Sequence, residues 1–437
     1  MLDTTPRSGT AAELLPPIYD TDAILADLPR QLEPWPNAQS STKITTCLRR
    51  AQKYGGWAWP SKPVVFISDP HADAESFLRS LQAAGVIRRD FGAAGPISLT
   101  DFGKTCRIIL GGDSLDKGPS NLAMLDALGQ ISSLEADLHI LAGNHDLRMR
   151  MVVEALRGPR SALTDHLFVR MGRKILPALG EVFDHFVTAA DMARLPDEVA
   201  CRERLLPGPD WETRFAHAAR DILRPKLLRQ EIAKLKNRQA MLDQEIIRLG
   251  LSHRQILAAA WKCQEVFFQP GGAYAWFYDR MDVVTRAGSL LFVHAGLCDQ
   301  MCETLVHQGA EAVNNQYRAA AEGAHFDFYF GPLANLVRTK YRDSDGRLTD
   351  HGVTLLHQAG IHMVVQGHVN NHKGQNLRSK CGLLHLEADI TLDRVSRGLE
   401  GLEGIGAGAT LIFPSGDVIG LSRDYPRAKH FAPDRIG

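Results

Sequence analysis

The stretch TCRIILGGDSLDKGP, residues 105–119, joins a short apolar run to a loop of glycines and charged side chains. The apolar part is rich in Ile and Leu and has the length of a strand that is buried on both faces. The loop behind it carries two carboxylates three residues apart, Asp113 and Asp116, with Lys117 beside the second. Its glycines allow backbone to approach other groups closely. A buried strand that ends in carboxylates predicts a functional site at the edge of a sheet.

Four further apolar runs also end at turns that contain Gly or Asp. Sequences with helical patterns lie between the first three of the five runs. The helical patterns are ESFLRSLQAAG (75–85) and SNLAMLDALGQI (120–131). Strands that alternate with helices predict a layered α/β core. Near the C-terminus, the turn PSGD joins two more runs and predicts an antiparallel pair. The four apolar runs are PVVFIS (63–68), DLHILAG (137–143), SLLFVHAG (289–296) and IHMVVQG (361–367).

Composition narrows the class of protein. The chain has 437 residues, 44% of them hydrophobic, and a formal net charge of +0, so it lacks the basic bias that nucleic-acid binding favours. Seven cysteines form no C-x-x-C pair, which indicates reduced thiols and a cytoplasmic setting. The first residues lack the apolar segment of a signal peptide, and no apolar run approaches the ~20 residues of a membrane-spanning helix. We therefore expect no membrane partner.

The pattern changes along the chain and suggests four parts. Residues 1–40 are rich in Pro, Thr, Ser and Ala and are predicted to be a flexible segment. The α/β core is predicted to be discontinuous, over residues 41–150 and 285–425. A helical insertion of residues 151–284 splits it, and residues 426–437 form a C-terminal tail.

Within the insertion, residues 227–250 carry a heptad seam with one polar position. An amphipathic helix that packs on its own domain explains the seam. A protruding helical hairpin, which caps the site or makes a dimer, explains it too, although three heptads are near the minimum for a coiled coil. The seam consists of Leu228, Ile232, Leu235, Gln239, Leu242, Ile246 and Leu249.

Each of the five apolar runs is followed by side chains that bind metals in proteins. The carboxyl ends of strands meet at one edge of an open α/β sheet, so donors far apart in the sequence converge there. Asp, His and Asn suit Mn, Fe, Zn or Mg. One tetrahedral ion cannot use so many donors, whereas two ions bridged by a carboxylate can. The candidate donors are Asp69, His71, Asp113, Asp116, Asn144, His145, Asp146, His294 and His368.

Each of these short motifs, taken alone, has a structural explanation as a polar turn or as a buried histidine at a strand end. Five motifs that each follow an apolar run agree only rarely by chance. The set as a whole therefore favours a metal centre.

The order of the motifs, D-x-H, GD-x-x-D-[RK]-G, GNH[DE], H-[AG]-G and G-H, resembles the calcineurin-like metallophosphoesterases. It is most similar to the phosphoprotein phosphatase branch, including the bacterial Shewanella-like phosphatases and the diadenosine tetraphosphatases. The resemblance covers roughly residues 60–150 and 285–425. It implies a four-layer α/β/β/α sandwich, two divalent metal ions and hydrolysis of a phosphate ester.

The resemblance also implies which residues hold the ions. One carboxylate would bridge them, and a water or hydroxide between them would attack phosphorus. The matching positions are Asp69 and His71 for the first ion, Asp113 for the bridge, and Asn144, His294 and His368 for the second ion. Ser68 and Ala72 stand where the family usually has glycines; both are small, so we expect the ligands to remain in place.

The remaining polar positions imply the rest of the chemistry. His145 would be the general acid, and Asp116 would accept a hydrogen bond from its imidazole. Lys117 stands where these phosphatases usually have an arginine, and gives phosphate a point charge instead of a planar fork. A second phosphate-binding arginine is expected between the last two motifs, and Arg338 is the candidate, with Lys340 and Arg342 as alternatives.

We therefore expect a phosphomonoester hydrolase that acts on a phosphorylated substrate, with phosphoserine or phosphothreonine in proteins as the leading class on the resemblance alone. A nucleotide or dinucleoside polyphosphate hydrolase is the alternative, because a lid formed by the insertion would select small substrates. A metal-bound scaffold without turnover is the non-enzymatic alternative. The complete set of donors argues against it.

Overall fold

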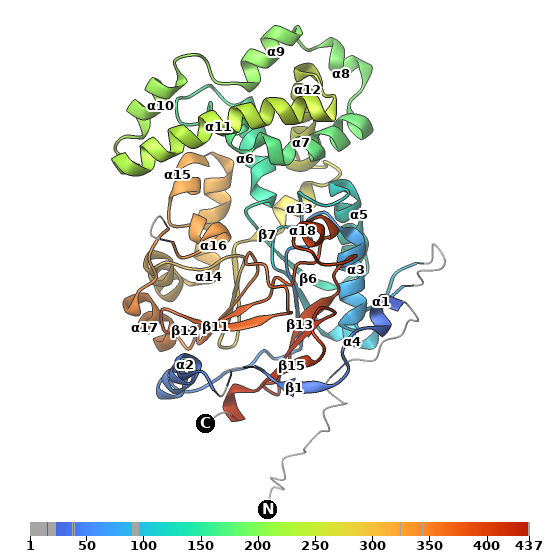
Figure 1. The fold of residues 1–437 in the computed structure, drawn as a ribbon, viewed down its shortest axis with the longest axis vertical. Coiled ribbons are helices and arrows are strands. Elements are labelled where there is room, and N and C mark those ends of the chain that lie inside the picture. The colour runs from blue at the N-terminus through green and yellow to red at the C-terminus, as the bar shows by residue number, and fades with distance from the viewer. Residues whose placement is uncertain are drawn as a thin grey trace, which may run out of the picture.

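In the computed structural model, two β-sheets pack face to face between layers of helices, and a helical region stands above them (Figure 1). A third, two-stranded sheet pairs β3 (Ile87–Arg88) with β4 (Ser98–Leu99). The structure describes Leu15, Ala38 and residues 23–36, 40–89, 96–323, 325–342 and 345–435. Much of the predicted flexible segment 1–40 lies outside these residues.

The larger sheet has eight strands, in the order β1-β15-β14-β13-β2-β5-β6-β7. Its centre, β2, β5 and β6, is parallel, as expected for runs connected by helices. The strands β13 and β14 on its other side are antiparallel, as the PSGD turn predicts. The bounds are β1 Leu32–Pro34, β2 Val64–Ile67, β5 Arg107–Leu110, β6 Asp137–Leu141, β7 Met281–Asp282, β13 Gly408–Ile412, β14 Val418–Ser422 and β15 Ala428–Phe431.

The smaller sheet has five strands, in the order β11-β12-β10-β9-β8. Its three central strands are parallel, and its two outer strands are antiparallel to their neighbours. The bounds are β8 Val284–Ala287, β9 Leu290–Val293, β10 Met363–Gln366, β11 Asn376–Lys380 and β12 Leu383–Glu387.

Buried side chains from both sheets form a core between them. Phe66 of β2 and Phe292 of β9 meet there, with ring centroids 5.8 Å apart. The outer faces of the sheets are covered by helices, which completes the α/β/β/α sandwich that the sequence predicts (Figure 1). The main covering helices are α3 (Ala74–Ala83) and α5 (Asn121–Ser133) on the larger sheet, and α14 (Asp299–Glu322) and α17 (Asp350–Gln358) on the smaller.

Both ends of the described chain belong to the larger sheet. The strand β1 pairs in parallel with β15, and the buried Trp35 beside it packs against Phe431 at a centroid distance of 6.4 Å. Residues 32–34 lie in the segment predicted to be flexible and residues 428–431 in the predicted tail, so the larger sheet extends beyond the predicted core limits of 41 and 425. Strands of three or four residues are too short to show the alternation on which strand prediction depends.

The insertion predicted over residues 151–284 is mainly helical and contains the predicted seam within α11. Its last residues differ from the prediction, because Met281–Asp282 forms β7 of the larger sheet and Val284 begins β8 of the smaller one. Leu235 and Leu242 on this helix are buried and belong to the main hydrophobic core. Glu231 of α11 forms a buried ion pair with Arg170 of α7 at 2.7 Å. Part of the seam therefore packs on its own domain. The main helices are α6 (Asp146–Arg157), α7 (Leu167–Phe186), α9 (Glu198–Leu205), α10 (Trp211–Ala219), α11 (Pro225–Leu249) and α12 (His253–Cys263).

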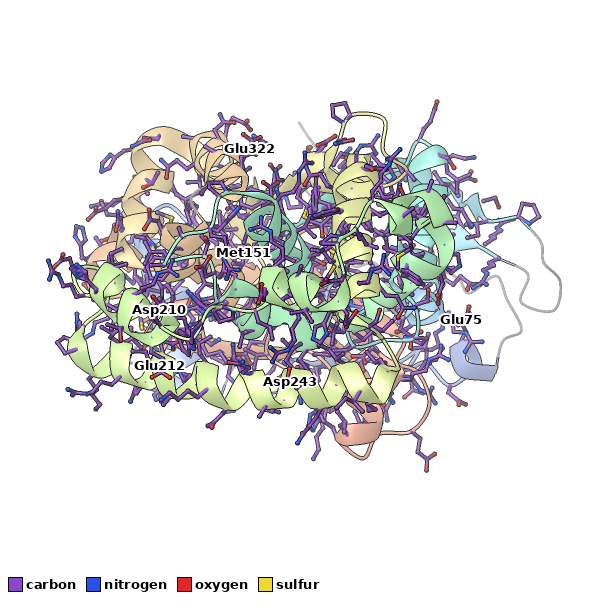
Figure 2. All side chains as sticks on the ribbon, turned by 90° about the horizontal axis from the view of Figure 1, so that it is seen from above. Glu75, Met151, Asp210, Glu212, Asp243 and Glu322 are labelled. Carbon is purple, nitrogen blue, oxygen red and sulfur yellow. The ribbon has the colours of Figure 1, made fainter. Side chains whose placement is uncertain are left out.

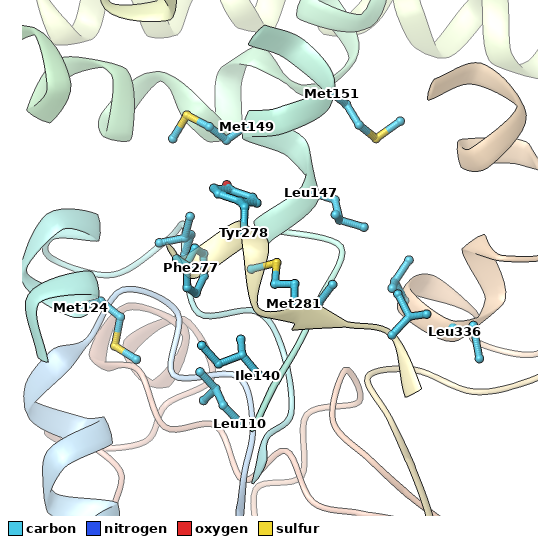
Figure 3. Close-up of a cluster of buried hydrophobic side chains, with 14 of the residues drawn as sticks. Leu110, Met124, Ile140, Leu147, Met149, Met151, Phe277, Tyr278, Met281 and Leu336 are labelled. Atoms are coloured by element: carbon cyan, nitrogen blue, oxygen red, sulfur yellow. The ribbon is translucent and has the colours of Figure 1, made fainter. Parts of the chain in front are cut away.

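Figure 3 shows the buried side chains where α6 leaves the sandwich and enters the insertion. Leu147 and Met149 near the start of α6 lie close to Tyr278, at the end of α13 (Ala275–Asp279), and to Met281. The Tyr278 hydroxyl donates to the backbone oxygen of Asp146 at 2.9 Å. The insertion thus shares one continuous apolar core with the sheet that carries the candidate donors.

All seven cysteines lie among the described residues and carry free thiols, six of them buried. Across the described part of the chain, we find no helix with the length and apolar character that crossing a membrane requires.

Candidate metal centre

The ends of the parallel strands are level with one another, which brings their loops to one edge. Ile67 at the end of β2 pairs with Leu110 of β5, and Leu110 pairs with Ile140 of β6. In the smaller sheet, Val293 of β9 pairs with Gln366 of β10. The residues after these positions are the five predicted motifs. Donors from both sheets therefore meet at the same end of the sandwich.

Backbone at this edge adopts a conformation that side-chain-bearing residues rarely use. Positive φ values outside glycine are uncommon, and they cluster where surrounding structure enforces them, often at functional sites. Six of the predicted site residues have one: Asp69 (57°), His71 (46°), Asp113 (54°), Asp116 (74°), Lys117 (71°) and His368 (65°).

Two glycines let the loops approach. A Cβ atom at Gly143 would lie 2.1 Å from Oδ1 of Asp113, and one at Gly112 would lie 2.7 Å from Nδ1 of His294. Either contact would force the loops apart. Gly112 also has a φ of +89°, which glycine adopts without strain.

Asp146 holds the loops together and is not oriented as a metal ligand. Its carboxylate accepts hydrogen bonds from the backbone N–H groups of Asp113, Ser114 and Leu115 at 2.8–3.0 Å. It also accepts one from Gly143 at 2.9 Å. The sequence analysis named Asp146 as a candidate donor; the structure uses both of its oxygens on backbone. Its place at the first position of α6 was the available signal, because acidic residues favour helix starts.

Among the residues that the structure describes, two groups of side chains are close enough to hold metal ions. Donor atoms of His71, Asp113 and His145 lie within 4.8 Å of one another, and so do those of Asp113, His294 and His368. Asp113 is common to both groups, which is the geometry of a bridging carboxylate. Its Oδ2 lies 3.4 Å from Nε2 of His294 and 3.9 Å from Nε2 of His71.

The other two predicted ligands border these groups. Oδ1 of Asp69 lies 3.7 Å from Nε2 of His71, while its Oδ2 accepts the backbone N–H of His368 at 3.0 Å. With the amide of Asn144 oriented so that both of its atoms find partners, its nitrogen donates to Nδ1 of His368 at 3.0 Å. All six predicted metal-ligand residues therefore come together.

The electrostatics of the site favour bound positive charge. Burial lowers the pKa of His294, but the carboxylates of Asp113 and Asp69 outweigh it and raise the pKa to about 10. Burial and the Lys117 ammonium hold the pKa of His71 well below its usual range. Burial also lowers the pKa of His368 strongly. The neutral imidazoles of His71 and His368 offer lone pairs to a metal ion. The carboxylates of Asp113 and Asp69 stabilise the proton on His294, and they would stabilise a metal cation at the same place.

A second observation, the hydrogen bonding of the histidine rings, also indicates that these donors suit divalent ions. Nε2 of His294 and Nε2 of His368 are buried and find no hydrogen-bond partner within the described chain. Meanwhile Nδ1 of His294 is directed to the backbone oxygen of Gly111 at 2.7 Å, which fixes the ring as outer partners of metal-binding histidines do. Unpartnered buried nitrogens of oriented rings match the requirement of a metal site.

His145 lies beside Asp113 and is oriented by Asp116. Its Nδ1 lies 2.7 Å from Oδ2 of Asp116, and its Nε2 lies 3.8 Å from Oδ2 of Asp113. Arg148, a residue that the sequence analysis missed, places Nη1 2.7 Å from Oδ2 of Asp116 and 2.5 Å from Nδ1 of His145. Burial lowers the pKa of His145 to about 4, against the opposing effect of Asp113.

The two residues predicted to contact phosphate, Lys117 and Arg338, lie in different surroundings. Nζ of Lys117 lies 2.7 Å from Nε2 of His71, so its charge reaches the ligand atoms. Arg338 lies at the end of α16 (Ala334–Arg338), 4.2 Å above the ring of Tyr329. It lines the same cleft as His368, as do Lys340 and Arg342, so the geometry does not choose among the three.

Asp389 is a further buried carboxylate that the sequence analysis missed. Its Oδ1 accepts the backbone N–H of Thr391 at 2.9 Å, and its Oδ2 is without a partner among the described residues. Burial raises its pKa far above the usual range, and the charge of Asp69 raises it further. It follows β12 at the same sheet edge, in the sequence LLHLEAD.

No family model and no curated protein matches the chain. Solved structures do, at low identity. A cold-active protein-tyrosine phosphatase of a psychrophilic Shewanella sp. is 15% identical, with a TM-score of 0.43, over 84% of this chain and 80% of its own. A protein serine/threonine phosphatase from Saccharomyces cerevisiae, with similarity to human phosphatase PP5, is 11% identical, with a TM-score of 0.38, over 86% and 84%.

Proposed function

We propose that the protein is a dinuclear-metal-dependent phosphomonoester hydrolase of the serine/threonine protein phosphatase type. The observation that carries the proposal is the convergence of Asp, His and Asn donors from five strand ends on one shared carboxylate, Asp113, with an oriented imidazole beside it. When bound, two divalent ions supply an activated water and neutralise charge on the phosphoryl oxygens. The candidate ions are Mn, Fe, Zn or Mg.

In this proposal, residues of the chain bind the metal ions, orient the general acid and transfer a proton. The ligands are Asp69, His71, Asp113, Asn144, His294 and His368. His145 protonates the leaving alkoxide from Nε2 while Asp116 holds its Nδ1. Burial lowers the pKa of His145 to about 4, and the negative charge of an entering phosphate dianion would raise it.

Two other functions remain as alternatives. Hydrolysis of a nucleotide or dinucleoside polyphosphate is supported by the insertion, which forms one wall of the cleft that His368 and Asn144 line. A metal-bound scaffold would need no general acid. The buried His145–Asp116 pair speaks against it, because an oriented acid next to the donors serves turnover and not metal binding alone.

Metal removal and replacement tests the proposed function. We expect the purified protein to contain about two transition-metal ions per chain, to hydrolyse an aryl phosphate, to lose this activity on chelation and to regain it with Mn²⁺ or Zn²⁺. Metal analysis and a substrate panel of phosphopeptides, mononucleotides and dinucleoside polyphosphates provide the measurement. Unchanged turnover in metal-stripped protein would contradict the mechanism.

The substitution Lys117→Arg tests whether this side chain contacts phosphate. Because an arginine fork can donate a second hydrogen bond, worth about 0.5–1.5 kcal/mol, we expect phosphate and vanadate to inhibit about 2- to 10-fold more tightly. Lys117→Gln, which lacks the charge, should weaken the same inhibition. Equal inhibition constants in all three proteins would show that position 117 makes no contact with the phosphoryl group.

A further inference from the structure

A cleft of about 1180 Å³ opens from the candidate metal centre toward the insertion. Asn144 and His368, two of the predicted metal ligands, line it, and so do side chains of α11 between Lys226 and Met241. One wall comes from α6, α7 and α11, and the other from α15 (His325–Phe330) and α16. Small-molecule sites are typically about 300–1,000 Å³, so this cleft has room for more than a phosphate group.

The cleft is strongly basic although the whole chain is neutral. Among the residues that the structure describes, eleven Lys or Arg side chains line it, against two carboxylates, those of Glu231 and Asp345. Both carboxylates are already occupied. Glu231 pairs with Arg170 at 2.7 Å and with Lys234 at 2.9 Å, and Asp345 accepts backbone N–H groups. Most of the positive charge is therefore not compensated by the lining carboxylates.

The effect of this charge is seen at Tyr329, in the wall formed by α15. Burial raises the pKa of the phenol, but the guanidinium groups of Arg170, Arg338 and Arg238 outweigh it and lower the pKa to about 8. Arg338 lies 4.2 Å from the ring centroid and Arg170 lies 5.0 Å from it. A site that stabilises a phenolate stabilises other anions too.

Apolar side chains lie between the cations, so the cleft does not match a bare polyphosphate. Met151, Met171 and Met241 line it, and methionine adapts to ligands of different shape. Seen from above in Figure 2, Met151 lies near the middle of the insertion, with Asp243 of α11 at the edge of the molecule. Cations interleaved with apolar groups match a peptide that carries both acidic and apolar side chains.

We infer that the cleft binds an extended, acidic peptide segment around the phosphorylated residue, and so selects phosphopeptides with carboxylates or further phosphates near the scissile phosphate. This inference rests on the proposed function. The donors at the end of the cleft are almost fully buried, with His294 at 0% and Asp113 at 2% exposure. An extended segment can deliver a phosphoserine there, while its neighbours remain in the basic cleft.

The first test compares two phosphopeptides of equal length, one with glutamates around a single phosphoserine and one with glutamines. We expect the native protein to hydrolyse the acidic peptide with a kcat/KM about tenfold higher, and this preference to fall with added salt. The double variant Arg173→Glu, Lys226→Glu should lose most of the preference. Both side chains are exposed and line the cleft, and Lys226→Glu places an acid in the first turn of α11, where it favours the helix.

The matched control is Arg229→Glu, an exposed side chain of the same helix that does not line the cleft. It should keep the preference. Equal kcat/KM for the two peptides in the native protein, or the same loss in the control as in the double variant, would overturn the inference. Stronger competition by a short RNA of similar charge than by the acidic peptide would also overturn it, because the occupant would then be a nucleic acid.

A second test measures peptide binding without turnover, and hydrolysis separately, so that it distinguishes the two proposals. In metal-stripped protein, a glutamate-rich peptide without phosphate should raise the Tyr329 pKa, measured by phenolate absorbance as the difference between native protein and Tyr329→Phe. An increase with no hydrolysis after metal reconstitution would support the cleft and reject the proposed function. Hydrolysis with no change in the phenol titration would support the proposed function and reject the acidic-peptide cleft.

Discussion

Asp113→Asn is expected to reduce turnover of an aryl phosphate by at least ~10²-fold and to lower the metal content of the protein. The reason is geometric: Asp113 alone belongs to both candidate metal groups in the described chain. Changes to residues that only support a ligand already cost about 10–100-fold in metal affinity or activity, so loss of a shared ligand should cost more.

The substitution Asp113→Asn removes the charge of the side chain and can keep one of its hydrogen bonds. Oδ1 of Asp113 accepts the backbone N–H of His145 at 2.7 Å, and an asparagine can keep that bond. What it loses is the charge, together with Oδ2, the atom nearest to the histidine nitrogens. Metal analysis, kcat/KM and circular dichroism give the readout, with Asp327→Asn on the exposed face of α15 as control. Full activity at an unchanged metal content would rule out Asp113 as the bridge.

The sequence predicts the parts of this site that depend on strands and short motifs. Apolar runs followed by Asp69, Asp113, His145, His294 and His368 could be recognised because strand ends converge by simple topology. The parallel centre of the larger sheet and the antiparallel pair after PSGD follow from equally local signals. Local sequence patterns are therefore sufficient to predict where a residue lies when the course of the backbone alone determines its position.

The features of the site that the sequence did not predict depend on contacts between residues that are distant in the chain. Asp146 appears in the sequence as one more acidic donor, and only the fold reveals that its oxygens accept four backbone N–H groups. Arg148 belongs to none of the five motifs, yet its Nη1 lies 2.7 Å from Asp116, 32 residues away in the chain, and completes the His145–Asp116 pair. The cations of the cleft come from several helices and from the loop after α16, in a chain whose net charge of +0 conceals them.

His145→Ala should lower kcat/KM for alkyl phosphates, such as phosphoserine peptides, by about 10²- to 10⁴-fold, the usual contribution of a general acid. An aryl phosphate, whose phenolate leaves without protonation, should lose much less. The structure supports this assignment because Nδ1 of His145 lies 2.7 Å from Asp116, which leaves Nε2 to face the reacting group. Kinetics with a series of esters that differ in leaving-group pKa provides the measurement.

A purely structural role for His145 predicts a different result. Loss of packing or of metal would slow both kinds of ester equally, since every substrate needs the same ions. The ratio of the two rates therefore separates proton transfer from damage to the site. Asp116→Asn should move the same ratio in the same direction by a smaller factor, because it removes the charge that orients the imidazole and leaves the acid in place. Equal losses for alkyl and aryl esters in both variants would remove His145 from the role of general acid.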